Sequence, residues 1–208
     1  MARLSAELQR FFFDEDCQPQ VTLADILKLA GERTFGFLFV LLSIPSALPI
    51  PAPGYSIPFG IVMFILAIQM IIGRDQPWLP AVWYKRSFSS ETVRAILKKG
   101  IPWLRRIEVV SRPRMSYICS SLPGRVIIGV AIALMSVSMM IPIPGTNTLP
   151  AIGIFVTGFG LLDDDGAISL GGLVLCLMGL ILSGSILIGI AFGASSLIDI
   201  IKDWLQSS

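Results

Sequence analysis

The sequence contains no histidine. A histidine-based catalytic triad, a histidine metal site and a histidine proton relay are therefore excluded. Acidic and basic residues are missing from three long stretches, residues 34–73, 126–162 and 170–198. These stretches hold neither a carboxylate that carries protons nor a base that activates a nucleophile. We therefore predict that the protein is not an enzyme.

Cysteine is scarce as well. The three cysteines, Cys17, Cys119 and Cys176, have neither the pairing of a disulfide framework nor the spacing of a zinc site. We expect no metal and no cofactor. The first eighteen residues mix acids and bases and lack the apolar core of a signal peptide, so we expect no cleavable signal.

Apolar residues, in contrast, are abundant. Hydrophobic residues make up 54% of the 208-residue chain, charged residues only 14%, and the mean hydropathy is +0.78. A soluble domain of this size is less apolar. Because lipid requires a backbone that satisfies its own hydrogen bonds, the long uncharged stretches predict an all-α integral membrane protein.

Two of the apolar stretches have the same design, and both are interrupted by proline and glycine. Arg33 precedes the first and Arg125 the second, while acidic residues close both. We interpret this as an internal duplication, and interrupted apolar segments at corresponding positions indicate a site at bilayer depth. The matching elements are Pro49-Ile50-Pro51 with Pro142-Ile143-Pro144, Ile57-Pro58 with Leu149-Pro150, and Gly60-Ile61 with Gly153-Ile154.

The basic residues are unevenly distributed. Eleven of the sixteen lysines and arginines lie between Arg74 and Arg125, and four precede Thr34. Under the positive-inside rule, the N-terminus and the middle block face the cytoplasm. Each arm of the first unit is only about 25 Å long as a helix, and a full second span would strand Asp163–Asp165 in lipid. These lengths favour re-entrant or broken hairpins over simple spans.

The chain divides into five parts on this interpretation. We predict that the basic segment 76–124 lies on the anionic inner leaflet of the membrane. We favour this interpretation of its cations over nucleic-acid binding. The glycines of the last span fit packing against the hairpins, with a homodimer as the second interpretation. The parts are a cytoplasmic amphipathic lead-in whose apolar stripe begins at Val21 (1–33), the first hairpin (34–75), a basic interfacial linker (76–124), the second hairpin (125–165), and a C-terminal transmembrane helix and tail (166–208).

The two interrupted loops are the candidate ligand site. Where a helix breaks inside a membrane, its ends expose amides or carbonyls with partial charge. Helices that begin near Pro58 and Pro150 present amides, and helices that end near Pro49 and Pro142 present carbonyls. The alternative is that these are tight turns shaped by proline and glycine. The candidate residues are Pro49, Pro51, Gly54, Ser56, Pro58, Pro142, Pro144, Gly145, Thr146, Asn147, Thr148 and Pro150.

The charged residues that flank the hairpins form a second group. Arginines of one copy are placed to pair with acids of the other, although solvated charges that set the topology are the simpler interpretation. We expect Gln69, alone on an apolar arm, to make an interhelical hydrogen bond. The flanking residues are Arg33, Arg74, Asp75, Arg125, Asp163, Asp164 and Asp165.

The doubled Pro-Ile-Pro element with its flanking arginines and aspartates, from about Thr22 to Ile200, resembles the ExoD family of bacterial exopolysaccharide synthesis proteins. The resemblance implies a bacterial inner-membrane protein linked to exopolysaccharide production, and it supplies no catalytic residues. Two hypotheses follow. The first is a transporter-like protein with a polar ligand or ion site at the two loops. The second is a non-transporting accessory subunit that organises polysaccharide synthesis machinery.

Overall fold

The computed structural model describes residues 20–22, 27, 31–47, 56–79, 87–89, 114–141 and 147–206. Within these ranges the regular secondary structure is helical except for two short strands, β1 (Gln20–Thr22) and β2 (Ser87–Ser89). The strands pair antiparallel, with Val21 opposite Phe88. The predicted helical class is therefore confirmed, but the helical stripe expected to begin at Val21 is wrong there, because Val21 belongs to a strand.

Four helices occupy the two interrupted apolar stretches. They are α3 (Thr34–Ala47) and α4 (Ser56–Ile71) in the first, and α8 (Leu122–Met140) and α9 (Thr148–Leu162) in the second. The short elements η2 (Gly31–Arg33) and α7 (Tyr117–Ser120) precede α3 and α8.

The ends of these helices follow from local sequence. Ser121 caps α8, since its Oγ accepts a hydrogen bond of 3.2 Å from the Gly124 amide. The helix ends where Ile141 turns extended, with φ −79° and ψ 117°. A residue that precedes a proline disfavours the helical conformation, so Pro142 accounts for this end.

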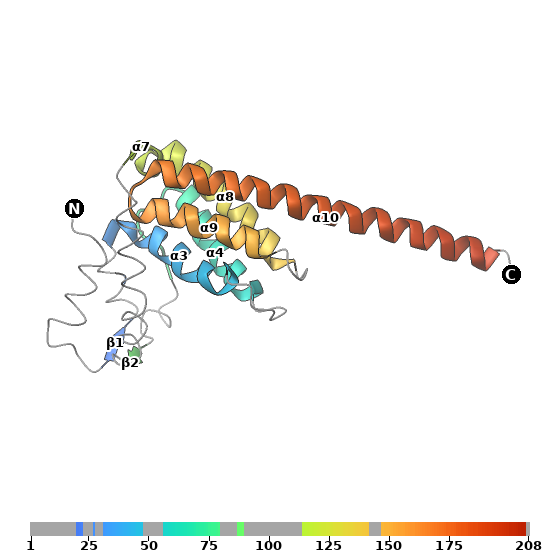
Figure 1. Ribbon diagram of the computed structural model, residues 1–208. Helices are drawn as coiled ribbons and strands as arrows, with labels where there is room; N and C mark the ends of the chain where they lie inside the picture. The colour runs from blue at the N-terminus through green and yellow to red at the C-terminus, as the bar shows by residue number, and fades with distance from the viewer. Residues whose placement is uncertain are drawn as a thin grey trace.

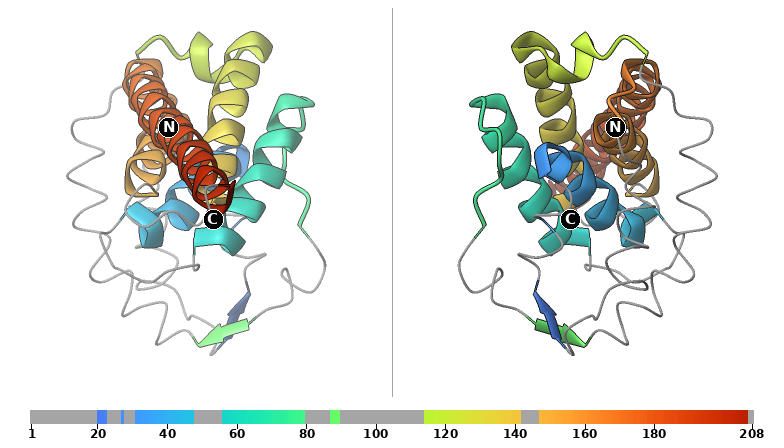
Figure 2. Two further views of the ribbon diagram at one scale, coloured as in Figure 1. Left: turned by 90° about the vertical axis from the view of Figure 1, so that its right-hand side faces the viewer. Right: turned by 90° about the vertical axis from the view of Figure 1, so that its left-hand side faces the viewer.

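Each arm packs more extensively against an arm of the other stretch than against the second arm of its own stretch. Helix α3 lies along α9, and α4 lies along α8, whereas α3 and α4 touch each other much less (Figures 1 and 2). Gly36, near the start of α3, meets Leu162 at the end of α9, so this pair runs antiparallel. The α4–α8 pair also runs antiparallel, because Gly129 near the start of α8 meets Ala67 and Ile71 late in α4.

Two glycines allow these close approaches. A Cβ added to Gly36 would lie 2.5 Å from the Leu162 amide nitrogen and 2.8 Å from the Gly158 carbonyl oxygen. A Cβ added to Gly129 would lie 2.7 Å from Cγ1 of Ile71 and 3.2 Å from the Ala67 carbonyl oxygen. Each glycine lies thirteen residues before the first proline of its own Pro-Ile-Pro element. Small residues at such positions let helix backbones approach in a membrane protein.

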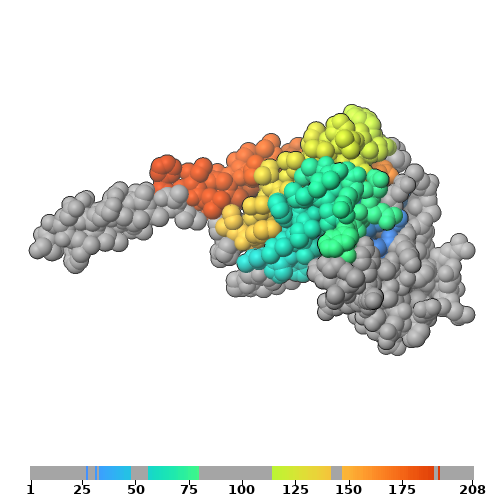
Figure 3. Space-filling model, turned by 180° about the vertical axis from the view of Figure 1, so that it is seen from behind, coloured from blue at the N-terminus to red at the C-terminus, as the bar shows by residue number. Residues whose placement is uncertain are grey.

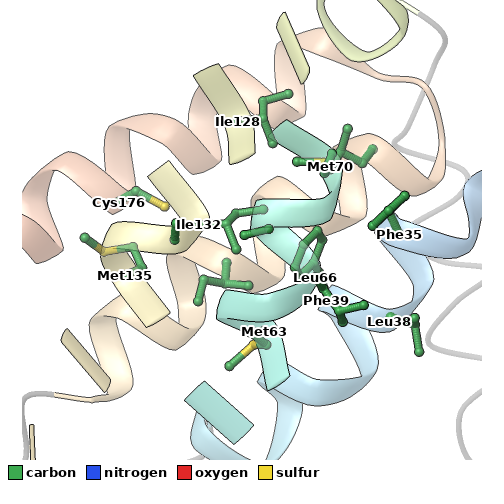
Figure 4. Packing of buried hydrophobic residues seen from close by; sticks show 14 of the residues in the cluster. Phe35, Leu38, Phe39, Met63, Leu66, Met70, Ile128, Ile132, Met135 and Cys176 are labelled. Carbon is green, nitrogen blue, oxygen red and sulfur yellow. The ribbon is translucent and has the colours of Figure 1, made fainter. Parts of the chain in front are cut away.

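The apolar core lies between the two helix pairs. Phe35, Leu38 and Phe39 of α3 are buried, and the rings of Phe35 and Phe39 stack with centroids 6.4 Å apart. Figure 4 shows this cluster at close range. The core also contains Met63, Leu66 and Met70 from α4, Ile128, Ile132 and Met135 from α8, and Cys176 from the last helix.

Helix α10 (Gly166–Gln206) has 41 residues, which correspond to about 60 Å. Its first part packs against α9 and α8, and it then continues beyond the bundle (Figures 1 and 3). The Ser138 hydroxyl donates a 2.8 Å hydrogen bond to Ser183 Oγ and so ties α8 to α10.

Among the described residues, two helical segments are long and apolar enough to cross a membrane, Leu122–Met140 and Gly166–Gly189. Helices α3, α4 and α9, with 14 to 16 residues, are shorter. Large apolar side chains such as Ile65, Ile127 and Ile181 face outward. An apolar exterior of this kind is expected of a protein whose solvent is lipid.

Candidate functional site

The starts of α4 and α9 are joined by side-chain hydrogen bonds. Asn147, which precedes α9, donates from Nδ2 to the Ser56 Oγ at 2.7 Å. The Ser56 hydroxyl in turn donates to the Met139 carbonyl oxygen, near the end of α8, at 3.3 Å. Ser56 is only 3% exposed. These contacts hold three helix ends together at the end of the bundle where the proline-rich loops begin.

Two buried side-chain oxygens in the described part of the chain have no hydrogen-bond partner, Asn147 Oδ1 and Ser46 Oγ. Ser46 is 2% exposed and lies in the last turn of α3. Because α3 and α9 run antiparallel, this turn lies at the end of the bundle where α9 begins. An unsatisfied buried polar group costs about 1–3 kcal/mol. Such groups are uncommon in native proteins, and a bound ligand is one reason for them.

The predicted helix boundaries agree with this geometry. Pro58 is the third residue of α4 and Pro150 the third of α9, while α3 and α8 end before their Pro-Ile-Pro elements. Thr148 begins α9. Six prolines and glycines of the candidate site and one further candidate lie outside the described residues, namely Pro49, Pro51, Gly54, Pro142, Pro144, Gly145 and Thr146. Their role in a ligand site stays a prediction.

The charged flanks gather at the opposite end of the bundle. Arg125 donates from Nη1 to Asp75 Oδ1 at 3.1 Å, and its Nη2 donates to the Arg74 carbonyl. The Arg125 side chain is 19% exposed and that of Asp75 is 90% exposed. The expected pairing between the two stretches is therefore found for Arg125 with Asp75, in a position that solvent reaches.

A cavity of about 480 Å³ opens beside this ion pair. Sequence reasoning found the charged residues but not the cavity, because it forms only where the ends of four helices and α7 meet. The inner part is apolar and includes Phe35, Met70 and Leu161. The polar wall contains Arg33, Asp75, Gln76, Ser120, Arg125 and Asp164.

Comparison with known proteins places the chain in a family. A family model described as "Exopolysaccharide synthesis, ExoD" matches residues 4–185. The chain belongs to the ExoD family. It is 48% identical over 206 residues to the uncharacterized protein slr1875 of Synechocystis, covering 99% of this chain and 97% of the relative. It is 30% identical over 155 residues to protein ExoD of Rhizobium meliloti, covering 73% of this chain and 64% of the relative. No solved structure matches the chain.

Asp165 of this ExoD family member has a structural role. Its Oδ1 accepts hydrogen bonds from the amides of Ala167 at 3.0 Å and Ile168 at 3.3 Å, so it caps α10. The signal was present in the sequence, since an aspartate directly before a long apolar helix is a typical N-cap. Asp165 therefore holds the start of α10 in place beside the cavity.

Cys119, also on the cavity wall, is a buried thiol. Its Sγ lies 3.6 Å from the Gly160 carbonyl oxygen and 3.4 Å from Ser169 Oγ. Burial raises the pKa of the Cys119 thiol, and the charges of Asp164 and Asp165 raise the pKa further, against a lowering by the Ser169 hydrogen bond. Because the thiolate is the reactive form, Cys119 is a poor nucleophile. The part of the chain that the structure describes contains no group of three metal-ligating side chains.

Gln69 corrects an expectation. Its amide donates to the Trp78 carbonyl at 3.1 Å, and its Oε1 accepts from the Trp78 backbone N–H. The predicted interhelical bond is therefore wrong. Gln69 instead fastens the segment that follows α4 to the end of that helix.

Proposed function

We propose that this ExoD family member is a multi-pass inner-membrane protein that supports exopolysaccharide synthesis as a transporter-like protein. Its polar ligand or ion binds where the two Pro-Ile-Pro loops meet. The observation that carries this proposal is the junction of Ser56 and Asn147 together with the two buried oxygens that lack partners. A bound ligand would satisfy those oxygens and remove their energetic cost.

The two buried oxygens without a hydrogen-bond partner suggest the chemistry of the ligand. Asn147 Oδ1 can only accept a hydrogen bond or contact a cation, and the Ser46 hydroxyl can also accept. The Ser56 hydroxyl already accepts from Asn147 and donates to Met139. A cation or a hydroxyl-bearing solute therefore fits better than a simple anion.

Helix lengths support placing this junction at bilayer depth. Helices α3, α4 and α9 are 14, 16 and 15 residues long, about 21–24 Å, against a hydrocarbon core of about 30 Å. If their charged ends lie at the cytoplasmic headgroups, as the basic residues of the sequence favour, the loops end inside the membrane. Irregular backbone at that depth is stable when it is buried in protein or lines a wet cavity.

The pairing of α3 with α9 and of α4 with α8, each across the two apolar stretches, supports the proposed duplication. Gly36 and Gly129 occupy equivalent positions and each opens a close approach to an arm of the other stretch. Ser43 and Ser136 each lie six residues before the first proline of their Pro-Ile-Pro element, and they are also equivalent under this alignment. Both are buried, and each hydroxyl donates a hydrogen bond to a carbonyl oxygen of its own helix. A pair of related units would place the two loops together at one shared site.

Flux through liposomes that contain the purified full chain tests the proposal. The probes are Na⁺, K⁺ and radiolabelled glucose. We expect one of them to cross, and we expect Asn147→Leu and Ser46→Ala to abolish that flux. Ser185→Ala is the matched control, because Ser185 is exposed on α10 and bonds only within its own helix. Absence of flux for all three probes, or flux that both variants retain, would refute the proposal.

Ser46→Ala adds a second readout. Removing an unpartnered buried hydroxyl relieves a desolvation cost, so the empty protein should unfold at a higher temperature by the equivalent of about 1 kcal/mol. Loss of flux combined with higher stability identifies a group kept for its ligand. Lower stability would indicate that the hydroxyl has a structural partner instead.

The accessory-subunit function is the second candidate, and the exposed surface of α10 favours it. Gly184 and Gly189 have open space where a Cβ would lie, and Leu177 and Ile181 on the same helix are exposed. Such a surface can pack against another helix in lipid. Absence of flux together with co-purification of a polysaccharide synthase, lost when bulky residues replace these glycines, would support this function.

A further inference from the structure

We propose that the cavity at the charged end of the bundle binds a neutral, hydroxyl-rich ligand of monosaccharide size. This site is separate from the Ser56–Asn147 junction, which lies at the opposite end of the same helices. Its volume of about 480 Å³ falls in the range of about 300–1,000 Å³ typical of small-molecule sites.

The charges of the wall favour a neutral ligand. Two guanidinium groups, Arg33 and Arg125, and two carboxylates, Asp75 and Asp164, line the cavity, so these four charges balance. An anion would meet two carboxylates, and a cation would meet two guanidinium groups. A hydroxyl group suits both, because it donates to a carboxylate and accepts from a guanidinium N–H.

The polar groups keep hydrogen-bonding capacity for such a ligand. Arg125 uses Nη1 for Asp75 and Nη2 for the Arg74 carbonyl, which leaves part of its five N–H donors. The Asp75 side chain is 90% exposed and is bonded through Oδ1. Gln76 adds an exposed amide that both donates and accepts.

Asp164 has an unusual backbone conformation. Its φ is +54°, in the left-handed region that most side chains avoid and that aspartate and asparagine tolerate. This turn lies between the end of α9 and the start of α10, where glycine would be the simplest choice. An aspartate here places a carboxylate on the cavity wall.

The inner part of the cavity suits the apolar C–H groups of a sugar ring. Phe35, Met70 and Leu161 supply apolar contacts, and a sugar ring carries C–H groups as well as hydroxyls. Ligand sites combine an apolar lining with a few polar groups that set orientation. The arrangement of charged wall and apolar interior therefore fits one class of molecule.

Calorimetric titration of the full chain in lipid nanodiscs tests this proposal. The probes are glucose and galactose as neutral ligands, glucose 1-phosphate as an anion and glycine betaine as a zwitterion. We expect saturable binding of a neutral sugar, at least tenfold tighter than either charged probe. Tighter binding of glucose 1-phosphate or of betaine, or no saturable binding of either sugar at millimolar concentrations, would overturn the proposal.

Variants locate the binding. Asp164→Asn keeps the left-handed backbone accessible and removes the charge, and Arg125→Gln removes a guanidinium. Each should weaken sugar binding about tenfold or more. Arg114→Gln is the matched control, because Arg114 is exposed and lies outside the cavity wall.

Asn147→Leu separates this proposal from the loop site, because it disables that site. Saturable sugar binding should remain in this variant, and adding Asp164→Asn to it should weaken the remaining binding about tenfold or more. If Arg125→Gln does not fold, Asp164→Asn carries the test alone. Sugar affinity that is the same in Asp164→Asn as in the unmodified protein would show that the cavity is not the site.

Discussion

Replacing Gly36 by alanine probes the pairing of α3 with α9. The new Cβ would lie 2.5 Å from the Leu162 nitrogen, 2.8 Å from the Gly158 oxygen and 2.9 Å from the Leu162 Cα. Carbon atoms in contact ordinarily lie about 3.5–4.0 Å apart. All three neighbours are backbone atoms, so no side chain can turn away and the helices must separate.

The expected cost follows from that geometry. Overpacking of a tight site costs about 1–3 kcal/mol, and alanine returns up to about 1 kcal/mol because it favours helix more than glycine does. We expect a net loss of about 1–2 kcal/mol from these terms. In a chain of this length such a loss lowers the midpoint of thermal unfolding by about 2–8 °C.

Two further alanine variants serve as references for Gly36→Ala. Gly129→Ala should cost less, because the nearest atom to its new Cβ is the side-chain Cγ1 of Ile71, which can move. Gly171→Ala should be neutral or stabilising, because nothing lies within 4 Å of its Cβ position. Thermal unfolding of the three variants in one detergent measures this order. Equal stability of Gly36→Ala and Gly171→Ala would refute the close packing of α3 on α9.

Two other predictions concern single side chains. Gln69→Leu removes both hydrogen bonds to the Trp78 backbone, and because Trp78 is exposed and water can replace them, we expect a loss of only about 1 kcal/mol in unfolding free energy. A loss larger than that of Gly36→Ala would contradict this reasoning. Cys119, buried and with a raised pKa, should stay a protonated thiol at the pH where an ordinary cysteine begins to ionise, and should react with N-ethylmaleimide far more slowly in the folded than in the denatured chain. Peptide mass spectrometry measures this, and equal rates in the two states would disprove it.

The class of the protein and the ends of its helices follow from local sequence. Uncharged apolar stretches predict helices in lipid, and proline limits where those helices can run. Ile141 is extended because Pro142 follows it, and Pro58 and Pro150 both lie in the first turn of their helices. The Asp165 cap is equally local, although only the structure shows which amides its carboxylate binds.

The pairing of helices does not follow from local sequence. Asn147 and Ser56 are separated by 91 residues, and Arg125 and Asp75 by 50. Nothing in the neighbourhood of either residue selects its distant partner. The sequence predicted two similar units and charges able to pair between them, but not that each arm would lie along an arm of the other unit.

By itself, then, the sequence determined an apolar helical protein of the ExoD family, with helices that stop at prolines, because these properties depend on composition and on sterics between neighbouring residues. Tertiary structure alone decided which helices pair, which buried oxygens lack partners and where the cavity opens. These features depend on close packing between distant segments, where a single Cβ at Gly36 would be enough to separate two helices.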